Sequence, residues 1–392
     1  MPPPAYDFDR HLAEMLRWEA EAGEAAFQLS GWTNPPDEVA IPWEFLNNIW
    51  KSSLSYVNEY VENEAAIKFL DGEQFLGRPE RFLILPNATT ALHLAIASAV
   101  DVWNVKCVGI VHPAYFAVGE ICSSLGLSQI NANIDSWADG GLAIADPFVT
   151  MDALSEVDLI VLTTPMYGAG LDLSMFASDM LAHGRKLNKC FLIDAVYEGM
   201  QLTKSSNSSN VFFRQFSDTC PRTLYVHSPS KVLFLNGAKA AVLTGDENAI
   251  IKANEIRNIK AGTVTAFQAL LIQALSSSQL PRNVADAMGQ NIEKVRGNLD
   301  ALSVLAASRG WRTVESMVGI HTVVFDPSKV LSLKDLTDFG LRLLRASGVF
   351  AVPLAGLGYC QDAPMGYRVN LAANWSSISA AFLRLAEFHA NF

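Results

Sequence analysis

A lysine in a serine-rich turn is the most informative feature of the sequence. This lysine is Lys231 in SPSKVLFLNGAKAAVLTG (228–245), where Ser228 and Ser230 precede it and Lys239 follows. A lysine amine with a pKa near about 10.4 is protonated in water, so it becomes a nucleophile only where burial or nearby cations lower that pKa. The two hydroxyl groups and the charge of Lys239 suit a phosphate monoester. The segment therefore indicates a lysine that forms an imine beside a phosphate site.

The same segment resembles the active-site lysine motif of class I/II pyridoxal-phosphate aminotransferases, the aspartate-aminotransferase-like enzymes of fold type I. The resemblance implies that Lys231 forms a Schiff base with pyridoxal 5'-phosphate (PLP). It also implies that Ser228, Ser230 and Lys239 contact the phosphate of this cofactor. In the family this lysine is both the point of attachment and the base that moves the substrate proton.

A second segment, IDAVYEG (193–199), is similar to the family's aspartate strand. The resemblance implies that the Asp194 carboxylate meets the pyridine nitrogen and keeps it protonated, so that the ring can draw electrons from the substrate. It places the hydroxyl of Tyr197 at the phenolic oxygen of the ring. Lys231, Asp194 and Tyr197 are thus the expected catalytic residues.

The family's phosphate-binding turn and ring-stacking aromatic residue also have counterparts. PNATTALHLAIA (86–97) resembles the turn in which backbone N–H groups at a helix start meet the phosphate, which implies that Asn87, Ala88 and Thr89 bind it. VHPAYFAVGEICSSLG (111–126) resembles the strand end whose aromatic residue stacks on the cofactor ring. Tyr115 is the residue expected there.

Two further segments match the parts of the family that bind the substrate. GYRVNLA (366–372) resembles the strand whose arginine grips the substrate α-carboxylate, which implies this role for Arg368. QLSGWTNPP (28–36) is similar to the turn that lines the substrate pocket, which places Gly31 and Trp32 there. All these segments occur in the family's order between about residues 28 and 385.

Two positions depart from the family pattern. In LTTPMYGAG (162–170), Tyr167 stands where the family has an asparagine that donates to the phenolic oxygen of the cofactor. Its phenol either makes that donation or turns away and leaves Tyr197 as the donor. Lys239 replaces a common arginine, which keeps the charge but loses the planar fork. The segment 261–268 contains no arginine, so specificity for a dicarboxylic substrate is not expected.

The elements that position these residues are apparent from the hydrophobic pattern. Short apolar runs alternate with helical stretches from about residue 80 to 245, which favours βαβ units and a mostly parallel sheet. The runs are predicted to be strands buried on both faces, with the ligand at their carboxyl ends. They are 81–86, 107–113, 158–165, 189–197, 223–230 and 238–245, and 90–100 is a predicted helix.

Together with the resemblance, this pattern predicts an α/β fold with two parts. We expect a large PLP-binding domain (46–285) built on a seven-stranded, mostly parallel sheet between helices. A smaller α+β domain is expected from the C-terminal third (286–392) and the N-terminal segment (1–45).

Composition excludes several other classes of protein. The formal charge of −11 and the absence of a basic stripe argue against nucleic-acid binding. No apolar span reaches the ~18 residues that cross a bilayer, and the N-terminus has no signal-peptide pattern. The five scattered cysteines suggest neither disulfides nor a metal site and fit a reducing cytoplasm.

Three functions follow from these observations. The first is an aminotransferase that converts an amino acid and a keto acid. The second uses the same carbanion for β- or γ-elimination, replacement or cyclisation, and Tyr167 favours it. The third is a binding or regulatory protein that has lost catalysis. The fold analogy also implies a homodimer in which Tyr56 or Tyr60 of the partner completes the phosphate site.

Overall fold

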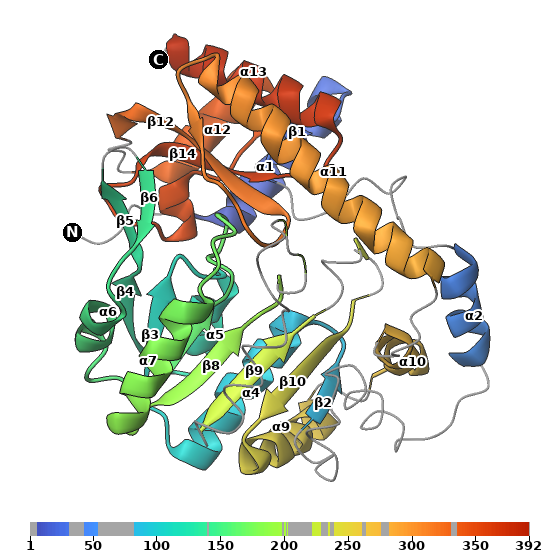
Figure 1. The fold of residues 1–392 in the computed structure, drawn as a ribbon, viewed down its shortest axis with the longest axis vertical. Helices are drawn as coiled ribbons and strands as arrows, with labels where there is room; N and C mark the ends of the chain where they lie inside the picture. The colour runs from blue at the N-terminus through green and yellow to red at the C-terminus, as the bar shows by residue number, and fades with distance from the viewer. Residues whose placement is uncertain are drawn as a thin grey trace.

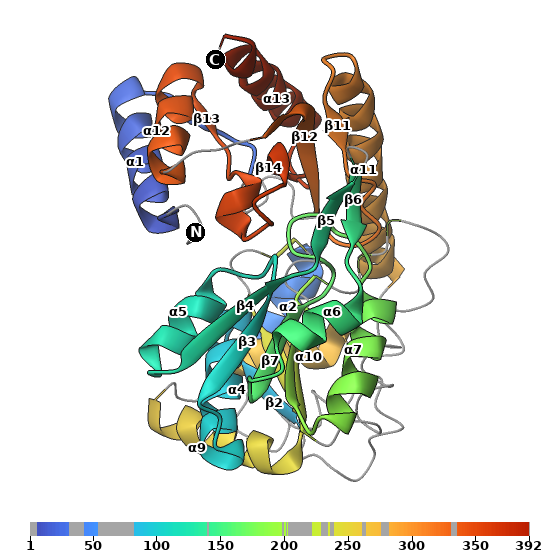
Figure 2. The same ribbon diagram turned by 90° about the vertical axis from the view of Figure 1, so that its left-hand side faces the viewer.

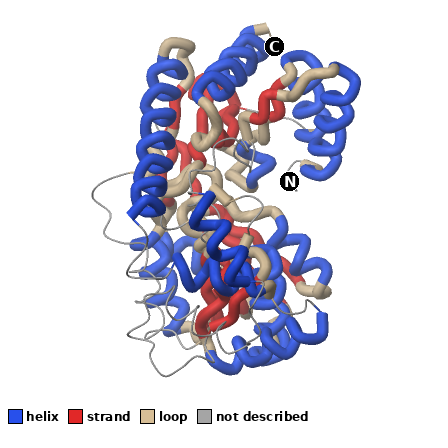
Figure 3. The backbone as a smooth tube through the Cα atoms, turned by 90° about the vertical axis from the view of Figure 1, so that its right-hand side faces the viewer, coloured by secondary structure: helices blue, strands red, loops and turns tan. Residues whose placement is uncertain are grey.

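The computed structural model contains a larger α/β part and a smaller α+β part (Figure 1). It describes residues 6–30, 43–53, 82–138, 141–197, 200, 202, 222–228, 234–235, 239–260, 264–275, 282–330 and 335–391. In Figure 3 the strands form the interior of both parts and helices cover them. No helix in these ranges is long and apolar enough to span a membrane.

A seven-stranded sheet forms the centre of the larger part, in the order β2-β10-β9-β8-β7-β3-β4. Only β10 runs antiparallel to its neighbours, so the prediction of a mostly parallel sheet is confirmed. The six predicted strands all form within a few residues of their expected bounds. The seven strands are β2 (Phe82–Leu85), β3 (Cys107–His112), β4 (Ser128–Asn133), β7 (Leu159–Thr163), β8 (Cys190–Asp194), β9 (Thr223–His227) and β10 (Ala241–Gly245).

Helices cover both faces of this sheet because its strands are apolar on both faces. In β7, Leu159 and Val161 face one hydrophobic cluster, whereas Ile160 and Leu162 face the other. The two groups of helices lie on opposite sides of the sheet in Figure 2. One side has α4 (Ala88–Trp103), α5 (Ala117–Ser124) and α9 (Glu247–Lys260), and the other has α6 (Pro147–Ala153) and α7 (Ser174–Lys186).

The smaller part joins the N-terminal segment to the C-terminal third of the chain. Its antiparallel sheet has the order β11-β12-β14, and β1 pairs with β13 in a second sheet. The helix α1 packs beside α12 (Figure 2). These elements are α1 (Phe8–Ala22), β1 (Phe27–Gln28), α11 (Arg282–Ala307), β11 (Arg312–Thr313), β12 (His321–Val330), α12 (Leu336–Ser347), β13 (Val349–Phe350), the 3-10 helix η4 (Leu354–Leu357), β14 (Pro364–Asn370) and α13 (Trp375–Ala390).

The remaining elements lie between or beside these two parts. A hairpin of β5 (Asp135–Ala138) and β6 (Gly141–Ile144) follows the edge strand β4, and α2 (Trp43–Ser53) packs on α10 (Ala266–Leu275). The two-part α/β architecture agrees with the sequence, whereas the domain boundaries at 45/46 and 285/286 stay a prediction.

Candidate active site

A buried carboxyl group stands at the carboxyl end of a central strand. Asp194 is the last residue of β8, follows the apolar run CFLI, and is only 3% exposed. The backbone N–H of Val196 donates to its Oδ1 at 3.3 Å. Burial raises the pKa of Asp194 from 3.8 to about 7, and the bond from Val196 opposes this shift. Within the described part of the chain Asp194 forms no ion pair.

The start of α4 presents donors to the same region. Asn87 is the N-cap of this helix, and its side-chain oxygen accepts from the backbone N–H of Thr90 at 2.8 Å. The N–H groups of Ala88 and Thr89 lie in the first turn, where helix geometry provides no acceptor and the helix dipole favours an anion. Lys239, just before β10, is exposed and adds a positive charge. This end of the site therefore favours an anion such as a phosphate.

Aromatic side chains stand beside these polar groups. The hydroxyl of Tyr115 lies 3.3 Å from that of Thr89, and burial raises the pKa of Tyr115 while this contact lowers it. The ring of Tyr115 makes edge contacts with Phe116 at 4.8 Å and with Tyr167 at 6.2 Å. Burial also raises the pKa of Tyr197, so this phenol keeps its proton and can donate it in a hydrogen bond.

A single cavity of about 530 Å³ unites these residues. Its volume falls in the range of about 300–1,000 Å³ that is typical of small-molecule sites. All nine of the expected cofactor residues that lie in the described ranges line this cavity. They are Asn87, Ala88, Thr89, Tyr115, Tyr167, Asp194, Tyr197, Ser228 and Lys239. The hydroxyl of Ser228 donates to the carbonyl oxygen of Ala240 at 2.7 Å, so it joins the end of β9 to the start of β10.

Arg368 occupies a different position from the other expected residues. It lies on β14, is 0% exposed, and lines neither the main cavity nor a second cavity of about 290 Å³ beside it. Its Nη1 donates to the hydroxyl of Tyr167 at 3.1 Å, and its Nη2 donates to the carbonyl oxygen of Ser30 at 2.6 Å. Arg368 is therefore connected to the site by its hydrogen bond to Tyr167, which lines the cavity.

Several expected residues lie outside the described ranges. These are Lys231 and Ser230 of the lysine turn, Gly31 and Trp32 of the N-terminal turn, and the two candidate partner tyrosines Tyr56 and Tyr60. Their roles stay predictions.

The sequence interpretation missed several residues at or beside the site, among them Phe8, Phe116 and Gln268. Phe8 at the start of α1 and Phe116 line both cavities, and their rings are 5.2 Å apart. Gln268 of α10 donates from Nε2 to the carbonyl oxygens of Pro86 at 3.3 Å and Lys239 at 2.8 Å. It therefore joins the two sides of the anion-binding end. Only the position of Phe116 beside Tyr115 gave a signal in the sequence.

Comparison with known proteins identifies the architecture. The sequence matches no protein-family model and no curated protein. Solved structures match almost the whole chain. A double mutant of the aspartate aminotransferase from Thermus thermophilus has a TM-score of 0.79 at 16% identity, covering 98% of this chain and 96% of that chain. The chain has the aspartate-aminotransferase-like fold.

Two other solved structures extend this similarity. The N-succinyldiaminopimelate aminotransferase from Mycobacterium tuberculosis has a TM-score of 0.74 at 17% identity, covering 96% of each chain. An Escherichia coli protein with a methionine aminotransferase function has a TM-score of 0.71 at 18% identity, again with 96% coverage of each chain. The expected fold is therefore confirmed over nearly the full length.

Within the aspartate-aminotransferase-like fold, the cavity lies where the strands of the large sheet end. Asp194 ends β8, Tyr115 follows β3, and Tyr167 follows β7. Ligands of open α/β sheets bind at the carboxyl ends of the strands, so the cavity is the candidate active site. The described residues contain no group of three or more His, Cys, Asp or Glu side chains that could hold a metal ion.

Proposed function

We propose that this protein binds PLP and acts on the α-carbon of an amino acid, as an aminotransferase that transfers the amino group to a keto acid. The aspartate-aminotransferase-like fold and the cavity support this proposal. The residues that line the cavity include one representative of each expected contact with the cofactor ring and its phosphate.

The buried carboxyl group of Asp194 is the observation that carries the proposal. A carboxyl group with a pKa of about 7 is partly protonated at neutral pH, and a nearby cation would favour its charged form. A protonated pyridine nitrogen is such a cation. The fit is specific because Asp194 lines the same cavity as the aromatic residues Tyr115 and Tyr197, which would contact a flat ring.

The start of α4 would provide the site for the negatively charged phosphate of the cofactor. The N–H groups of Ala88 and Thr89 would donate to phosphate oxygens, and the ammonium group of Lys239 would add a charge interaction. Gln268 would keep these two groups at a constant separation. Ser228 would support the same end of the cavity, since its hydroxyl can accept a further hydrogen bond.

The chemistry then divides between the cofactor and the chain. When bound, PLP withdraws electrons from the substrate and makes its Cα proton removable. Lys231 would move that proton from Cα to the aldehyde carbon of the cofactor. Tyr197 would donate to the phenolic oxygen, and Arg368 would hold and orient the α-carboxylate of the substrate.

Borohydride reduction followed by peptide mapping tests this proposal. The protein is incubated with PLP, reduced and digested, and we expect a pyridoxyl label on Lys231. Lys106→Ala is a suitable comparison, because it removes an exposed lysine that does not line the cavity and should keep the label. Absence of the label from Lys231 in the wild-type protein would refute the proposed function.

Tyr167 supports a second candidate, elimination, replacement or cyclisation at the same α-carbon. Its hydroxyl is bonded to Arg368, and its large ring takes the place of the family's asparagine in the cavity. Product analysis separates the two reactions. A keto acid together with the aminated cofactor supports transamination, whereas release of a substituent from the amino-acid side chain supports the second candidate.

We also propose that the protein is a cytoplasmic homodimer. The helix α2 carries two tryptophans, Trp43 and Trp50, that are 75% and 55% exposed, as expected for residues that meet a partner. Light scattering after size-exclusion chromatography tests this. A dimeric mass is the expected result, and a monomer at micromolar concentration would contradict it.

A further inference from the structure

The guanidinium group of Arg368 is enclosed by the chain. It is 0% exposed, and its two terminal nitrogens donate to the hydroxyl of Tyr167 and the carbonyl oxygen of Ser30. Its central carbon lies 5.6 Å from the centre of the Tyr167 ring. Arg368 therefore contacts Tyr167 through both the hydroxyl and the aromatic ring.

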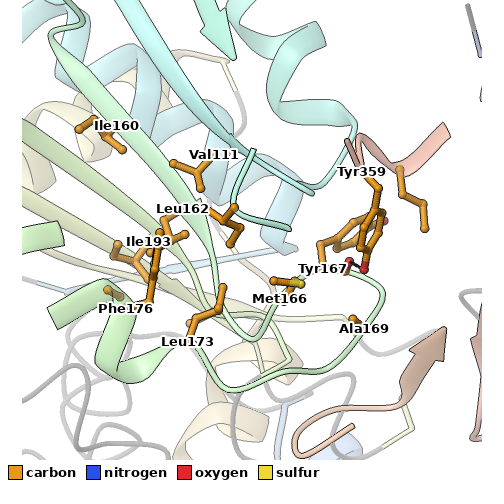
Figure 4. Close-up of a cluster of buried hydrophobic side chains, with 14 of the residues drawn as sticks. Val111, Ile160, Leu162, Met166, Tyr167, Ala169, Leu173, Phe176, Ile193 and Tyr359 are labelled. Carbon is orange, nitrogen blue, oxygen red and sulfur yellow. Dashed lines mark hydrogen bonds between the residues drawn. The ribbon is translucent and has the colours of Figure 1, made fainter. Parts of the chain in front are cut away.

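Tyr167 separates Arg368 from the space that a ligand can enter. Its side chain lines both cavities, whereas Arg368 lines neither. The hydroxyl of Tyr359 donates to the backbone oxygen of Tyr167 at 2.9 Å, and these two tyrosines lie beside each other at the loop after β7 (Figure 4). Gly168 permits this packing, because its backbone is left-handed (φ +84°) and an added Cβ would lie only 3.2 Å from Leu357 Cδ1. A ligand in either cavity consequently meets the phenol before it meets the guanidinium.

This arrangement has a consequence for carboxylate binding. An arginine holds a carboxylate best in a bidentate fork that uses two N–H groups on the same side. Nη1 of Arg368 donates one of its N–H groups to the Tyr167 hydroxyl, and Tyr167 lines both cavities whereas the buried Arg368 lines neither. A carboxylate that enters from either cavity therefore reaches this side of the guanidinium only if the Tyr167 hydroxyl moves away from Arg368.

We propose that Tyr167 is a specificity-determining residue that competes with the carboxylate of a ligand for Arg368. The site then discriminates between a carboxylate and a neutral group of the same shape, and it binds carboxylates only when the Tyr167 hydroxyl leaves Arg368. This inference rests on the proposed function, in which Arg368 is the carboxylate-binding residue. It adds that Tyr167 sets how tightly a carboxylate is held.

A pair of isosteric ligands measures this competition directly. The pair is 3-phenylpropionate and 3-phenylpropanamide, whose phenyl ring suits the space beside Phe8 and Phe116, which line both cavities. Both are titrated calorimetrically into the PLP-loaded full-length protein and into its Tyr167→Phe variant. The variant keeps the ring but loses the hydroxyl that bonds to Arg368. We expect its affinity for the carboxylate to rise by about 10- to 100-fold, as for the loss of one hydrogen bond to a charged group, while its affinity for the amide stays the same.

Control variants separate this effect from a general change in the site. Tyr367 precedes Arg368 on β14, and its buried hydroxyl is hydrogen-bonded to His389. Tyr367→Phe removes this phenol and should leave the ratio of carboxylate to amide affinity unchanged. Tyr167→Leu also removes the ring, adds no hydrogen-bond acceptor for Arg368, and should raise the ratio at least as far. The double variant Tyr167→Phe/Arg368→Gln should lose the gain, because the charge that binds the carboxylate is gone.

The opposite results overturn the inference. Equal or weaker carboxylate binding by Tyr167→Phe means that the hydroxyl does not compete, and an equal gain for both ligands means that only space has changed. Failure of every variant to bind the carboxylate means that Arg368 is not its site. The same titrations on the cofactor-free protein keep this test independent of the proposed function, which fails separately if PLP does not label Lys231.

Discussion

Replacing Asp194 by asparagine removes a titrating carboxyl group from the protein interior and keeps the shape of the side chain. In the folded cofactor-free protein, burial raises the pKa of this group from 3.8 to about 7. In the unfolded chain the pKa is that of an ordinary aspartate, about 3.9. Asp194→Asn should therefore change how the free energy of unfolding depends on pH.

The sign follows from the protons that each state holds. Between about pH 4 and pH 7 the unfolded chain has lost the Asp194 proton and the folded chain has kept it, so the free energy of unfolding falls as the pH rises. The shift of about 3 units, at about 1.4 kcal/mol per unit, makes the full effect about 4 kcal/mol. About 2.5 kcal/mol of this lies between pH 5 and pH 8. In the absence of PLP, the free energy of unfolding of Asp194→Asn relative to that of the wild-type protein should therefore rise by this amount from pH 5 to pH 8.

PLP should reverse the order of the two proteins. Bound as proposed, its protonated pyridine nitrogen would stabilise the charged form of Asp194, and the asparagine variant could not make this ion pair. Urea unfolding followed by circular dichroism at pH 5 and pH 8, with and without PLP, measures both effects. If the difference in unfolding free energy between the two cofactor-free proteins is the same at both pH values, the raised pKa of Asp194 is wrong.

Three further predictions concern the anion-binding end and the small part. Lys239→Ala should lower the affinity for PLP by about 10-fold, measured by equilibrium dialysis, and should leave the affinity for pyridoxal, which has no phosphate, unchanged. An equal loss of affinity for both ligands would contradict a contact between Lys239 and the phosphate. Gln268→Leu removes two hydrogen bonds to backbone carbonyls and should lower the free energy of unfolding by about 1–3 kcal/mol in urea titrations, and an unchanged midpoint would exclude this role. Burial lowers the pKa of His11 from 6.5 to about 4, so stability should be lost as the pH falls through this window, by about 3 kcal/mol in total. In His11→Leu the free energy of unfolding should fall less steeply as the pH drops from 6.5 to 4. An equally steep fall in the variant would show that His11 does not cause this loss of stability.

The strands of the large sheet could be predicted because each has a continuous apolar run. LIVLT in β7 and CFLID in β8 are buried along their whole length, so their composition alone identifies them. The edge strand β4 was missed. Its sequence SQINAN is polar and mostly exposed, and its conformation depends on pairing with β3. The hairpin of β5 and β6 was missed as well, and DSWA has no run of apolar residues.

The candidate site divides in the same way. Asp194 and Asn87 could be predicted because each lies in a short segment that contains other expected site residues, Tyr197 in one and Ala88 and Thr89 in the other. Phe8 and Gln268 reach the site from distant helices, and only tertiary packing brings them there. The burial of Arg368 behind Tyr167 was equally beyond the sequence, since 201 positions separate the two side chains.

Two ionisable groups in the interior give the strongest reason to regard this cavity as a ligand site. Asp194 and Arg368 are 3% and 0% exposed, and they belong to different parts of the fold. A buried charge is costly, and apolar residues of similar volume often stabilise a fold as well or better. Stability alone therefore does not explain these two residues. A ligand with a cationic ring nitrogen and a carboxylate would use both, and the bond from Arg368 to Tyr167 would let the second charge stay satisfied until that carboxylate arrives.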